Sequence, residues 1–306
     1  PMARLENSGV YEAIVKGDCE EFKYHFVVNL NGQLVEATDP YAFALTSNSR
    51  YGYVVNPEKL QQIDLHKESL PPFNKLTDAI IYEVDVRDAT SLTGFENKGT
   101  YKALSQEGLK DSNGNPVGLD YIKSLEVTHV QLLPVYDFQT IDEDHPAKQY
   151  NWGYDPKFYF APEGSYSTNP DDCYTRLFEL RELVGSFHKN GLRAVMDVVF
   201  NHTAEGNECG PFISFKGFDN QIYYMLTPDG KYYNFSDFLI EHWLTDKERQ
   251  EYKEEPEEKE TYREIAYKHC HDKVQKSGAV SRPTLRHWFG FGKADTNKSP
   301  RRSQII

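Results

Sequence analysis

The chain has 306 residues, of which 39% are hydrophobic and 14% aromatic, enough for one large domain or two medium ones. Aspartate and glutamate together number 47 against 34 lysines and arginines, which gives a formal net charge of −13. Nucleic acids and anionic membranes need a basic face on their partner, so this balance disfavours both. A neutral or cationic partner fits the composition better.

Cysteine usage and hydropathy bear on the compartment. The four cysteines lie far apart and without a C-x-x-C spacing, at Cys19, Cys173, Cys209 and Cys270. We therefore expect free thiols in a reducing compartment. No stretch reaches the roughly 18 apolar residues of a membrane helix. The first ten residues lack the features of a signal peptide, so we expect a cytoplasmic protein. A start inside a longer parent chain is equally compatible with these residues.

The run His269-Cys270-His271 has the residue types of a metal site. Adjacent helical positions point in different directions, however, so three consecutive side chains cannot easily face one ion. We expect no metal there.

Residues 9–56 have the pattern of β-structure. "FKYHFVV" places Phe22, Tyr24 and Phe26 on one face of a strand, and Asn31-Gly32 is a strong hairpin signal between two strand-like runs. The segment is too short for a complete β-sandwich. We expect residues 1–56 to be the end of such a module, followed by a polar linker over residues 57–78.

Strands and helices alternate from residue 79 onward. Apolar runs predict strands at 79–86, 128–138 and 192–200, and three-residue spacing predicts a helix over 118–127. Strands that are apolar on both faces and joined by helices are typical of a parallel sheet. A (β/α)8 barrel and an open doubly wound sheet both begin this way. No G-x-G-x-x-G or P-loop follows these strands, which disfavours the nucleotide-binding versions of the open sheet.

A second helix is expected before the third strand. Asn169 suits its N-cap and Pro170 its first position, and Gly191 should end it after Asn190. Its apolar face carries Leu177, Leu180, Val184 and Phe187.

The composition changes after residue 236. Residues 237–306 are dense in charge, poor in aliphatic side chains and interrupted by Pro256, which predicts solvated helices or disorder.

Two segments combine the residue types of a ligand site. The loop of residues 148–170 carries many aromatic rings among Gly, Pro, Asn and Asp, and the third strand ends in Asp197, Asn201 and His202. A lone Asp or His usually settles into a local polar contact, so neither is informative alone. Sugars suit the combination, because their ring faces stack on Tyr and Trp while their hydroxyls bond Asp, Asn and His.

These same segments resemble a known family. "MDVVFNHTAEG" is similar to the first conserved region of the α-amylase superfamily of glycoside hydrolases, and "YNWGYDP" with "PEGSYSTNP" resembles type I pullulanases, which cleave α-1,6 branch links. "FKGFDNQIYYMLTPDGKYYNFS" is nearer to isoamylases and glycogen-debranching relatives. The resemblance covers about residues 9–236. It implies an α/β fold in which residues 79–236 are the first three βα units of a (β/α)8 TIM barrel.

The resemblance also implies roles for individual residues. Tyr154 would stack on the glucose before the cleaved bond, and Trp152 and Asp155 would shape that pocket. His202 would hydrogen-bond the same glucose, and Asp197 would hold the charged network of the site. Asn201 would be structural, and it is a calcium ligand in calcium-binding relatives; we predict no cofactor or metal for this chain. Phe158 and Phe160 are expected to be packing residues.

Some features depart from the family. Asp85 stands where the resemblance predicts His, and Glu126 where it predicts Gly. Retaining glycosidases use two carboxyl groups about 5–5.5 Å apart. The family presents the nucleophile in a G-F-R-F-D motif and the acid Glu on the next strand, and neither motif occurs in the 306 residues. No catalytic residue is therefore identifiable.

The sequence thus favours a fragment of a pullulanase-like hydrolase for α-1,6 links in pullulan, starch or glycogen. Its partner would be a branched α-glucan, not nucleic acid or a membrane, and its oligomeric state stays open. Two alternatives remain: a non-catalytic α-glucan-binding protein, and a non-functional product of a reading frame that breaks near residue 236.

Overall fold

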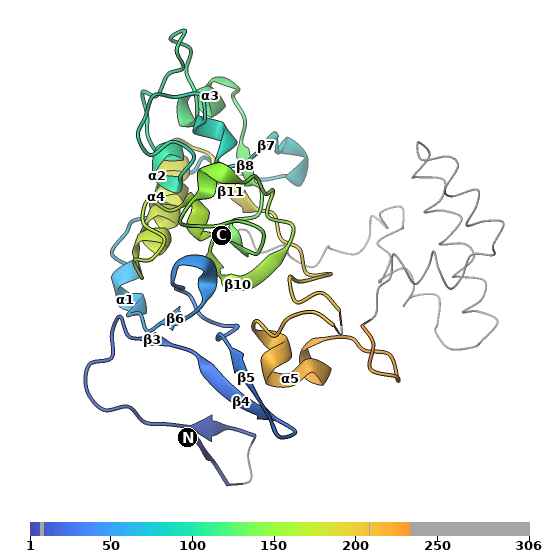
Figure 1. The fold of residues 1–306 in the computed structure, drawn as a ribbon. Helices are drawn as coiled ribbons and strands as arrows, with labels where there is room; N and C mark the ends of the chain where they lie inside the picture. Colours follow the sequence, from blue (N-terminus) through green and yellow to red (C-terminus); the bar gives the residue numbers. More distant parts are fainter. Residues whose placement is uncertain (7–8, 208, 233–306) are drawn as a thin grey trace, which may run out of the picture. The chain divides into compact units, whose positions relative to one another are not determined.

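A parallel sheet of three short strands, in the order β11–β8–β7, forms the centre of the structure (Figure 1). The strands are β7 (Ile81–Val84), β8 (His129–Leu132) and β11 (Arg193–Met196). In the register of the sheet, Val130 lies between Tyr82 and Ala194. The predicted alternation of strands and helices is therefore confirmed, with each strand beside its neighbour in the chain.

The computed structural model describes residues 1–6, 9–207 and 209–232. Residues 1–223 belong to one compact unit, and a second unit begins at Tyr224. The described part of the second unit is a short hairpin closed by a bridge between Leu226 and Tyr232. The predicted charged region 237–306, with the His269-Cys270-His271 run, lies outside the described residues.

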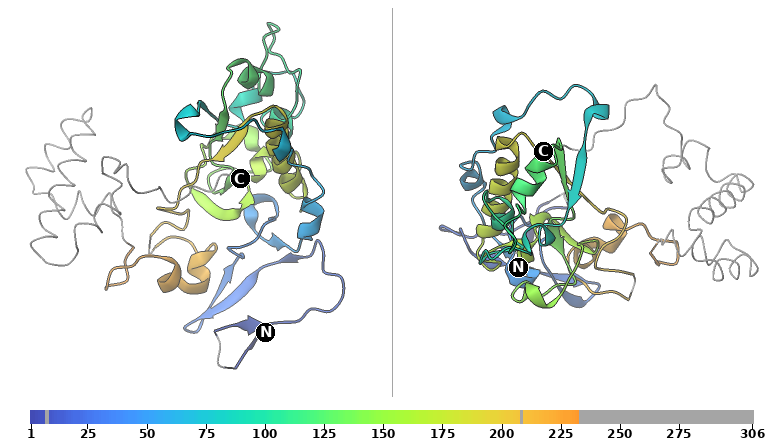
Figure 2. Two further views of the ribbon diagram at one scale, coloured as in Figure 1. Left: turned by 180° about the vertical axis from the view of Figure 1, so that it is seen from behind. Right: turned by 90° about the horizontal axis from the view of Figure 1, so that it is seen from above.

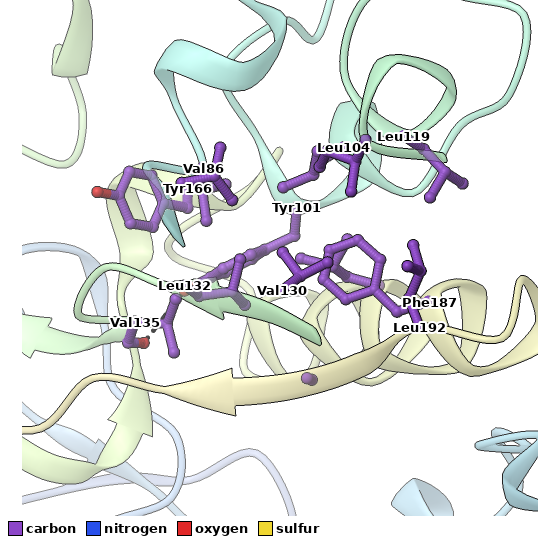
Figure 3. Close-up of a cluster of buried hydrophobic side chains, with 14 of the residues drawn as sticks. Val86, Tyr101, Leu104, Leu119, Val130, Leu132, Val135, Tyr166, Phe187 and Leu192 are labelled. Atoms are coloured by element: carbon purple, nitrogen blue, oxygen red, sulfur yellow. Dashed lines mark hydrogen bonds between the residues drawn. The ribbon is translucent and has the colours of Figure 1, made fainter. Parts of the chain in front are cut away.

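Three helices cover the parallel sheet: α2 (Tyr101–Leu104), α3 (Leu119–Ser124) and α4 (Thr175–Lys189). Figure 3 shows Phe187 of α4 and Leu192 beside Val130 of β8. The fully or almost fully buried members of this core include Val86, Tyr101, Leu104, Leu119, Ile122, Val130, Leu132, Leu183 and Phe187. Each large apolar side chain buried here stabilises the fold by about 1.5–3 kcal/mol.

The predicted second strand is broken in two. Pro134 separates β8 from β9 (Tyr136–Phe138), because proline has no N–H for a central ladder. β9 then pairs antiparallel with β10 (Pro156–Pro162). The third strand is also shorter than predicted, and it ends at Met196. Asp197, Asn201 and His202 consequently lie in the segment that follows the strand.

Helix α4 begins later than predicted. Asn169 is not its N-cap; the helix starts at Thr175, where Asp172 Oδ1 accepts hydrogen bonds from the backbone N–H groups of Tyr174 and Thr175. The N-cap residue is Tyr174, and the side chain of Asp172 instead closes the turn that leads into the helix. The other end is confirmed: α4 ends at Lys189, and Gly191 takes the left-handed conformation with φ +78°.

The N-terminal part contains only two-stranded pairs. The strands are β1 (Ala3–Arg4), β2 (Tyr11–Glu12), β3 (Lys23–Tyr24), β4 (Phe26–Leu30), β5 (Gln33–Ala37) and β6 (Gly52–Tyr53). β1 pairs with β2, β3 with β6, and β4 with β5. In both views of Figure 2, as in Figure 1, these strands belong to the blue N-terminal part of the ribbon.

The hairpin between β4 and β5 is confirmed, with Asn31 and Gly32 both at positive φ. The prediction of a single strand through Phe22, Tyr24 and Phe26 is wrong. The chain divides at His25 into β3 and β4, which belong to different sheets. His25 instead stacks on Tyr51, with ring centroids 5.0 Å apart.

The segment 57–78 contains helix α1 (Pro57–Leu60) and lies against α4. Arg181 of α4 donates to the carbonyl of Ile63 (3.2 Å), and His188 Nδ1 bonds the carbonyl of Leu65 (2.6 Å). The segment that was predicted to be a linker from its polar composition is thus held against α4, because side chains of α4 bond its backbone carbonyls.

The described thiols are free, as predicted: Cys19, Cys173 and Cys209 form no disulfide. None of the helices in the described part of the chain combines the length and hydropathy needed to span a membrane.

Glu126, where the family resemblance predicts Gly, sits at φ +54°. A side chain in this left-handed conformation costs about 1–2 kcal/mol, which glycine avoids. We therefore expect Glu126→Gly to leave the free energy of unfolding unchanged or to raise it by up to about 1 kcal/mol. Urea denaturation measures this. The matched control is Glu182→Gly, at an exposed position inside α4, which should lose about 1 kcal/mol. Equal losses in the two variants would contradict the explanation.

Candidate functional site

Hydrogen bonds join the aromatic loop to the segment after β11. The phenol of Tyr154 donates to Asp197 Oδ2 (2.9 Å), and His202 Nε2 lies 2.5 Å from the carbonyl oxygen of Tyr154. Asn201 Nδ2 lies 3.0 Å from His202 Nδ1. Four of the six predicted site residues therefore form one connected group, in which Tyr154 lies more than 40 positions from the other three in sequence.

These bonds fix how His202 carries its proton. A carbonyl oxygen only accepts, so Nε2 must donate to Tyr154. In the neutral ring Nδ1 is then the acceptor for the amide N–H of Asn201. The imidazole is thus oriented through both of its nitrogens. The backbone of His202 is held as well, because the phenol of Tyr159 donates to its carbonyl (3.2 Å).

Gly153 determines the path of the loop. It sits at φ +88°, and a Cβ atom there would lie 2.8 Å from Pro134 Cβ and 2.9 Å from Phe138 Cδ1. Only glycine combines that conformation with so close an approach. The side chain of Asn151 accepts from the N–H of Gly153 (2.8 Å), which completes the turn. The loop therefore rests directly on β9 and on Pro134.

Asp155 and Trp152 play different parts from those four residues. Both carboxylate oxygens of Asp155 are occupied: Oδ1 accepts from Asn151 within the loop, and Oδ2 accepts from the backbone and hydroxyl of Thr140, which follows β9. Asp155 thus braces the loop. Trp152 is 59% exposed, and its ring centroid lies 6.5 Å from that of Tyr150. The indole is therefore available as a flat surface next to Tyr154.

The two exposed tyrosines of the loop stay protonated over the ordinary pH range. Burial, followed by the hydrogen bond to Asp197, raises the pKa of Tyr154 to about 12. Burial and the bond to Asp88 raise the pKa of Tyr150 to about 12 in the same way. Both phenols consequently remain donors.

Asp85, which replaces the histidine that the resemblance predicts, is buried and bonded elsewhere. It accepts from the phenol of Tyr166 (3.1 Å) and from the backbone of Arg87 and Asp88. Burial raises the pKa of this carboxyl. Its contacts identify it as a structural residue at the end of β7.

A buried charge cluster, which sequence analysis did not find, lies under the aromatic loop. Arg176 of α4 is fully buried and donates to Glu143 (2.9 Å) and, more loosely, to Asp137 (3.4 Å). It also donates to the carbonyls of Pro162 and Pro170 (3.0 and 2.8 Å). Glu163 accepts from the backbone of Phe138 and Ser165. One cation thus faces three buried carboxyl groups.

This imbalance shifts the acids of the cluster. Burial and the charge of Glu143 raise the pKa of Asp137 to about 7, and burial with both neighbouring acids raises the pKa of Glu163 well above its usual range. Burial opposes the charge on Arg176, but the three acids outweigh it and raise the pKa of the guanidinium. The raised pKa values mean that Asp137 and Glu163 hold protons at pH values where an ordinary carboxyl group is ionised.

A sequence signal for this cluster did exist. Arg176 occupies the same helical face as Leu180, Leu183 and Phe187, at spacings of four, seven and eleven residues. A charged residue on an apolar face must be paired when it is buried. The partners of Arg176 come from separate segments of the chain, so they could not be identified from the sequence.

Within residues 1–6, 9–207 and 209–232, two groups of side chains have metal-binding residue types. Oxygens of Asp137, Glu143 and Glu163 lie within 4.8 Å of one another, as do ligand atoms of Asp64, His66 and Glu68. In the first group Arg176 already supplies a cation, and the second is largely exposed. The amide nitrogen of Asn201 faces His202.

Comparison with known proteins connects this geometry to a family. The model of the alpha amylase catalytic domain matches residues 100–276, more than half of the chain. The chain belongs to the alpha-amylase catalytic-domain family. The match runs past residue 236, where sequence analysis expected the resemblance to end.

Pullulanases and isoamylases are among the proteins similar to this chain. The Pullulanase of Bacillus subtilis (strain 168) is 44% identical over 213 residues, which cover 69% of this chain and 29% of that protein. Isoamylase SU1, chloroplastic, of Zea mays is 33% identical over 239 residues, 71% of this chain and 27% of that protein. The chain thus spans less than a third of the length of these relatives.

Solved structures agree. The pullulanase of Anoxybacillus sp. LM18-11 complexed with maltotetraose is 41% identical, with a TM-score of 0.68 over 75% of this chain and 33% of that one. The apo pullulanase of Paenibacillus barengoltzii is 38% identical, with a TM-score of 0.68 over 75% and 35%. The family match and these neighbours identify the fold as the (β/α)8 type.

The raised pKa of Asp137 makes the stability of the fold depend on pH. Between the ordinary carboxyl pKa near 4 and about 7, the folded chain holds a proton that the unfolded chain has lost. The contribution of this group to the free energy of unfolding therefore decreases as pH rises through that window, by up to about 1.4 kcal/mol for each pH unit.

Asp137→Asn should make the free energy of unfolding less dependent on pH in this window. Urea denaturation at pH 4.5, 5.5 and 6.5 measures the slope, with the exposed Asp78→Asn as control. A slope that is the same in both variants would contradict the assignment.

Proposed function

We propose that this chain belongs to a pullulanase-like glycoside hydrolase and contributes its glucose-binding part. The substrate class is branched α-glucan, with α-1,6 links as in pullulan, starch or glycogen. The observation that carries the proposal is the connected group of Tyr154, Asp197, Asn201 and His202 beside the exposed ring of Trp152. A flat phenol next to oriented polar groups suits a sugar, which has an apolar ring face and a rim of hydroxyls.

Each residue has a role in this proposal. Tyr154 stacks on the glucose, and Trp152 extends the aromatic surface. His202 bonds a sugar hydroxyl when the carbonyl of Tyr154 releases its N–H, and Asp197 receives the phenol and orients the ring. Asn201 sets the tautomer of His202. Asp155 acts indirectly, because its bonds hold the loop on which Trp152 and Tyr154 lie.

The larger architecture is part of the proposal. The parallel strands β7, β8 and β11 are taken as the first three strands of a (β/α)8 barrel, within residues 79–236. Residues 1–56 are taken as the end of a β-sandwich module, and 57–78 as the connection to the barrel. The solved pullulanase complexes with maltotetraose and maltotriose support an α-glucan as ligand. No cofactor is required for the proposed binding.

A second candidate is a non-catalytic α-glucan-binding protein. One observation favours it: the 306 residues contain no G-F-R-F-D motif and no acid motif that follows it. Hydrolysis with retention needs two carboxyl groups about 5–5.5 Å apart. Asp197 is bonded to Tyr154 and is paired with no acid in the described residues. The two candidates share the glucose site and differ only in turnover.

Binding is tested first. We expect Tyr154→Ala to weaken the affinity for maltotriose by about three- to tenfold, because the stacking ring is lost. Tyr154→Phe retains the ring and should lose less. Isothermal titration calorimetry gives the dissociation constants.

The matched control for this test is Tyr121→Ala in α3. Its ring is 42% exposed, close to the 37% of Tyr154, and it packs against Tyr82 away from the site. Affinity for maltotriose should be unchanged in this variant. Equal affinities of the wild type and Tyr154→Ala would remove the stacking assignment.

Turnover distinguishes the two candidates. We expect the purified chain to release no reducing ends from pullulan, because the nucleophile and acid motifs are missing from it. A reducing-sugar assay, after removal of host amylases by a second chromatographic step, measures this. Release that persists, and that Asp197→Asn abolishes, would show that the chain contains its own catalytic carboxyl group.

A further inference from the structure

A second group of aromatic rings lies at the surface of residues 1–223, outside the residues used so far. It consists of Tyr41, Phe43, Phe160 and Tyr223, which we call the aromatic face. Tyr41 and Phe43 follow β5, Phe160 belongs to β10, and Tyr223 ends helix α5 (Phe215–Tyr223). Figure 1 shows the three labelled elements β5, β10 and α5 next to one another. Three segments far apart in sequence thus present rings together.

The rings are in contact. The ring centroids of Tyr41 and Phe160 are 5.5 Å apart, and those of Phe43 and Phe160 are 6.4 Å apart. The phenol oxygens of Tyr41 and Tyr223 are 3.0 Å apart, and Phe215 lies against both rings, at 6.4 and 4.8 Å. The four rings therefore form one surface.

That surface is open to solvent. Tyr41 is 52% exposed, Phe43 54%, Phe160 48% and Tyr223 38%. Phe160 was predicted to be a packing residue, but about half of its side chain is exposed. Phe158, two positions earlier, is fully buried as predicted. Single exposed apolar residues are ordinary, but a contiguous exposed apolar group indicates a binding surface.

The aromatic face is continuous with the proposed glucose site. Tyr159, the neighbour of Phe160 on β10, has its ring 6.2 Å from that of Phe215 and 5.4 Å from that of Phe200. Its phenol donates to the carbonyl of His202 (3.2 Å). Through Phe215, which packs on Tyr41 and Tyr223, Tyr159 thus connects the aromatic face to the backbone of His202 in the proposed site.

We propose that the aromatic face is a second α-glucan-binding surface, on which a longer glucan chain rests while one of its glucose units occupies the site at Tyr154. This inference rests on the proposed function. Rings in place of aliphatic side chains favour sugar faces, since planar π-systems stack on them. The two adjacent phenols retain lone pairs for sugar hydroxyls, and burial followed by the contact with Tyr41 raises the pKa of Tyr223 to about 12. The net charge of −13 also favours an uncharged ligand over an acidic one.

Binding to the two surfaces can be distinguished with two ligands of different length. Maltotriose is short and should report the site at Tyr154 alone, whereas glycogen should contact both surfaces. The variant is Phe43→Ala/Phe160→Ala, in which both side chains are about half exposed, so the fold should persist. The control is Val27→Ala/Leu34→Ala on the β4–β5 hairpin, where the side chains are 56% and 70% exposed. Phe43→Tyr/Phe160→Tyr keeps both rings and should restore binding.

Affinity electrophoresis in gels containing glycogen, together with calorimetry for maltotriose, gives the two affinities. We expect the double alanine variant to lose about tenfold in glycogen affinity with maltotriose affinity unchanged, at about threefold for each ring. The control and the double tyrosine variant should match the wild type.

Three results would overturn the inference. Unchanged glycogen affinity in the double alanine variant would remove the aromatic face and leave the proposed function standing. Dissociation of a wild-type dimer by the same variant, without a change in glycogen affinity, would assign the face to a second copy of the chain. Loss of glycogen affinity in the double alanine variant, with neither ligand affected by Tyr154→Ala, would contradict the proposed function and the continuity of the two surfaces.

Discussion

The buried guanidinium of Arg176 is the interaction on which the rest of the structure depends. It ties helix α4 to β9 through Asp137, to the following loop through Glu143, and to the end of β10 through the carbonyl of Pro162. Glu143 also accepts from the backbone of Asn48, so the N-terminal part is fastened to the same point. Removing one partner of a buried ion pair costs about 3–5 kcal/mol, because the remaining charge is left uncompensated.

The site is built outward from this cluster. Asp137 precedes Phe138, and the backbone N–H of Phe138 donates to Glu163. The ring of Phe138 lies so close to Gly153 that a Cβ atom at Gly153 would not fit. Gly153 in turn fixes Trp152 and Tyr154 on either side of it. The segment after β11 then meets the loop through Asp197 and His202. The proposed sugar-binding surface consists of loops, and the buried charges beneath it position those loops.

The sequence predicted those features that depend on local chemistry. Asn31-Gly32 specifies its hairpin and Gly191 ends α4, since each needs a left-handed backbone. The meeting of Tyr154 with Asp197 and His202 followed from placing both segments at the ends of parallel strands. The partners of Arg176 and the bonds of Asp155 to Thr140 could not be predicted, because each depends on which distant segments become neighbours. The break at Pro134 was missed although its cause is local, since proline has no N–H for a central strand. The aromatic face has the same origin, since Tyr41 and Phe160 meet only in the folded chain.

If the aromatic loop and the segment after β11 form a glucose-binding site, a crystal structure of this chain soaked with maltotetraose will show the sugar there. We expect a glucose ring stacked on Tyr154, with a hydroxyl oxygen within hydrogen-bonding distance of His202 Nε2. An oligosaccharide bound elsewhere while the pair of Tyr154 and His202 stays solvent-filled would contradict it.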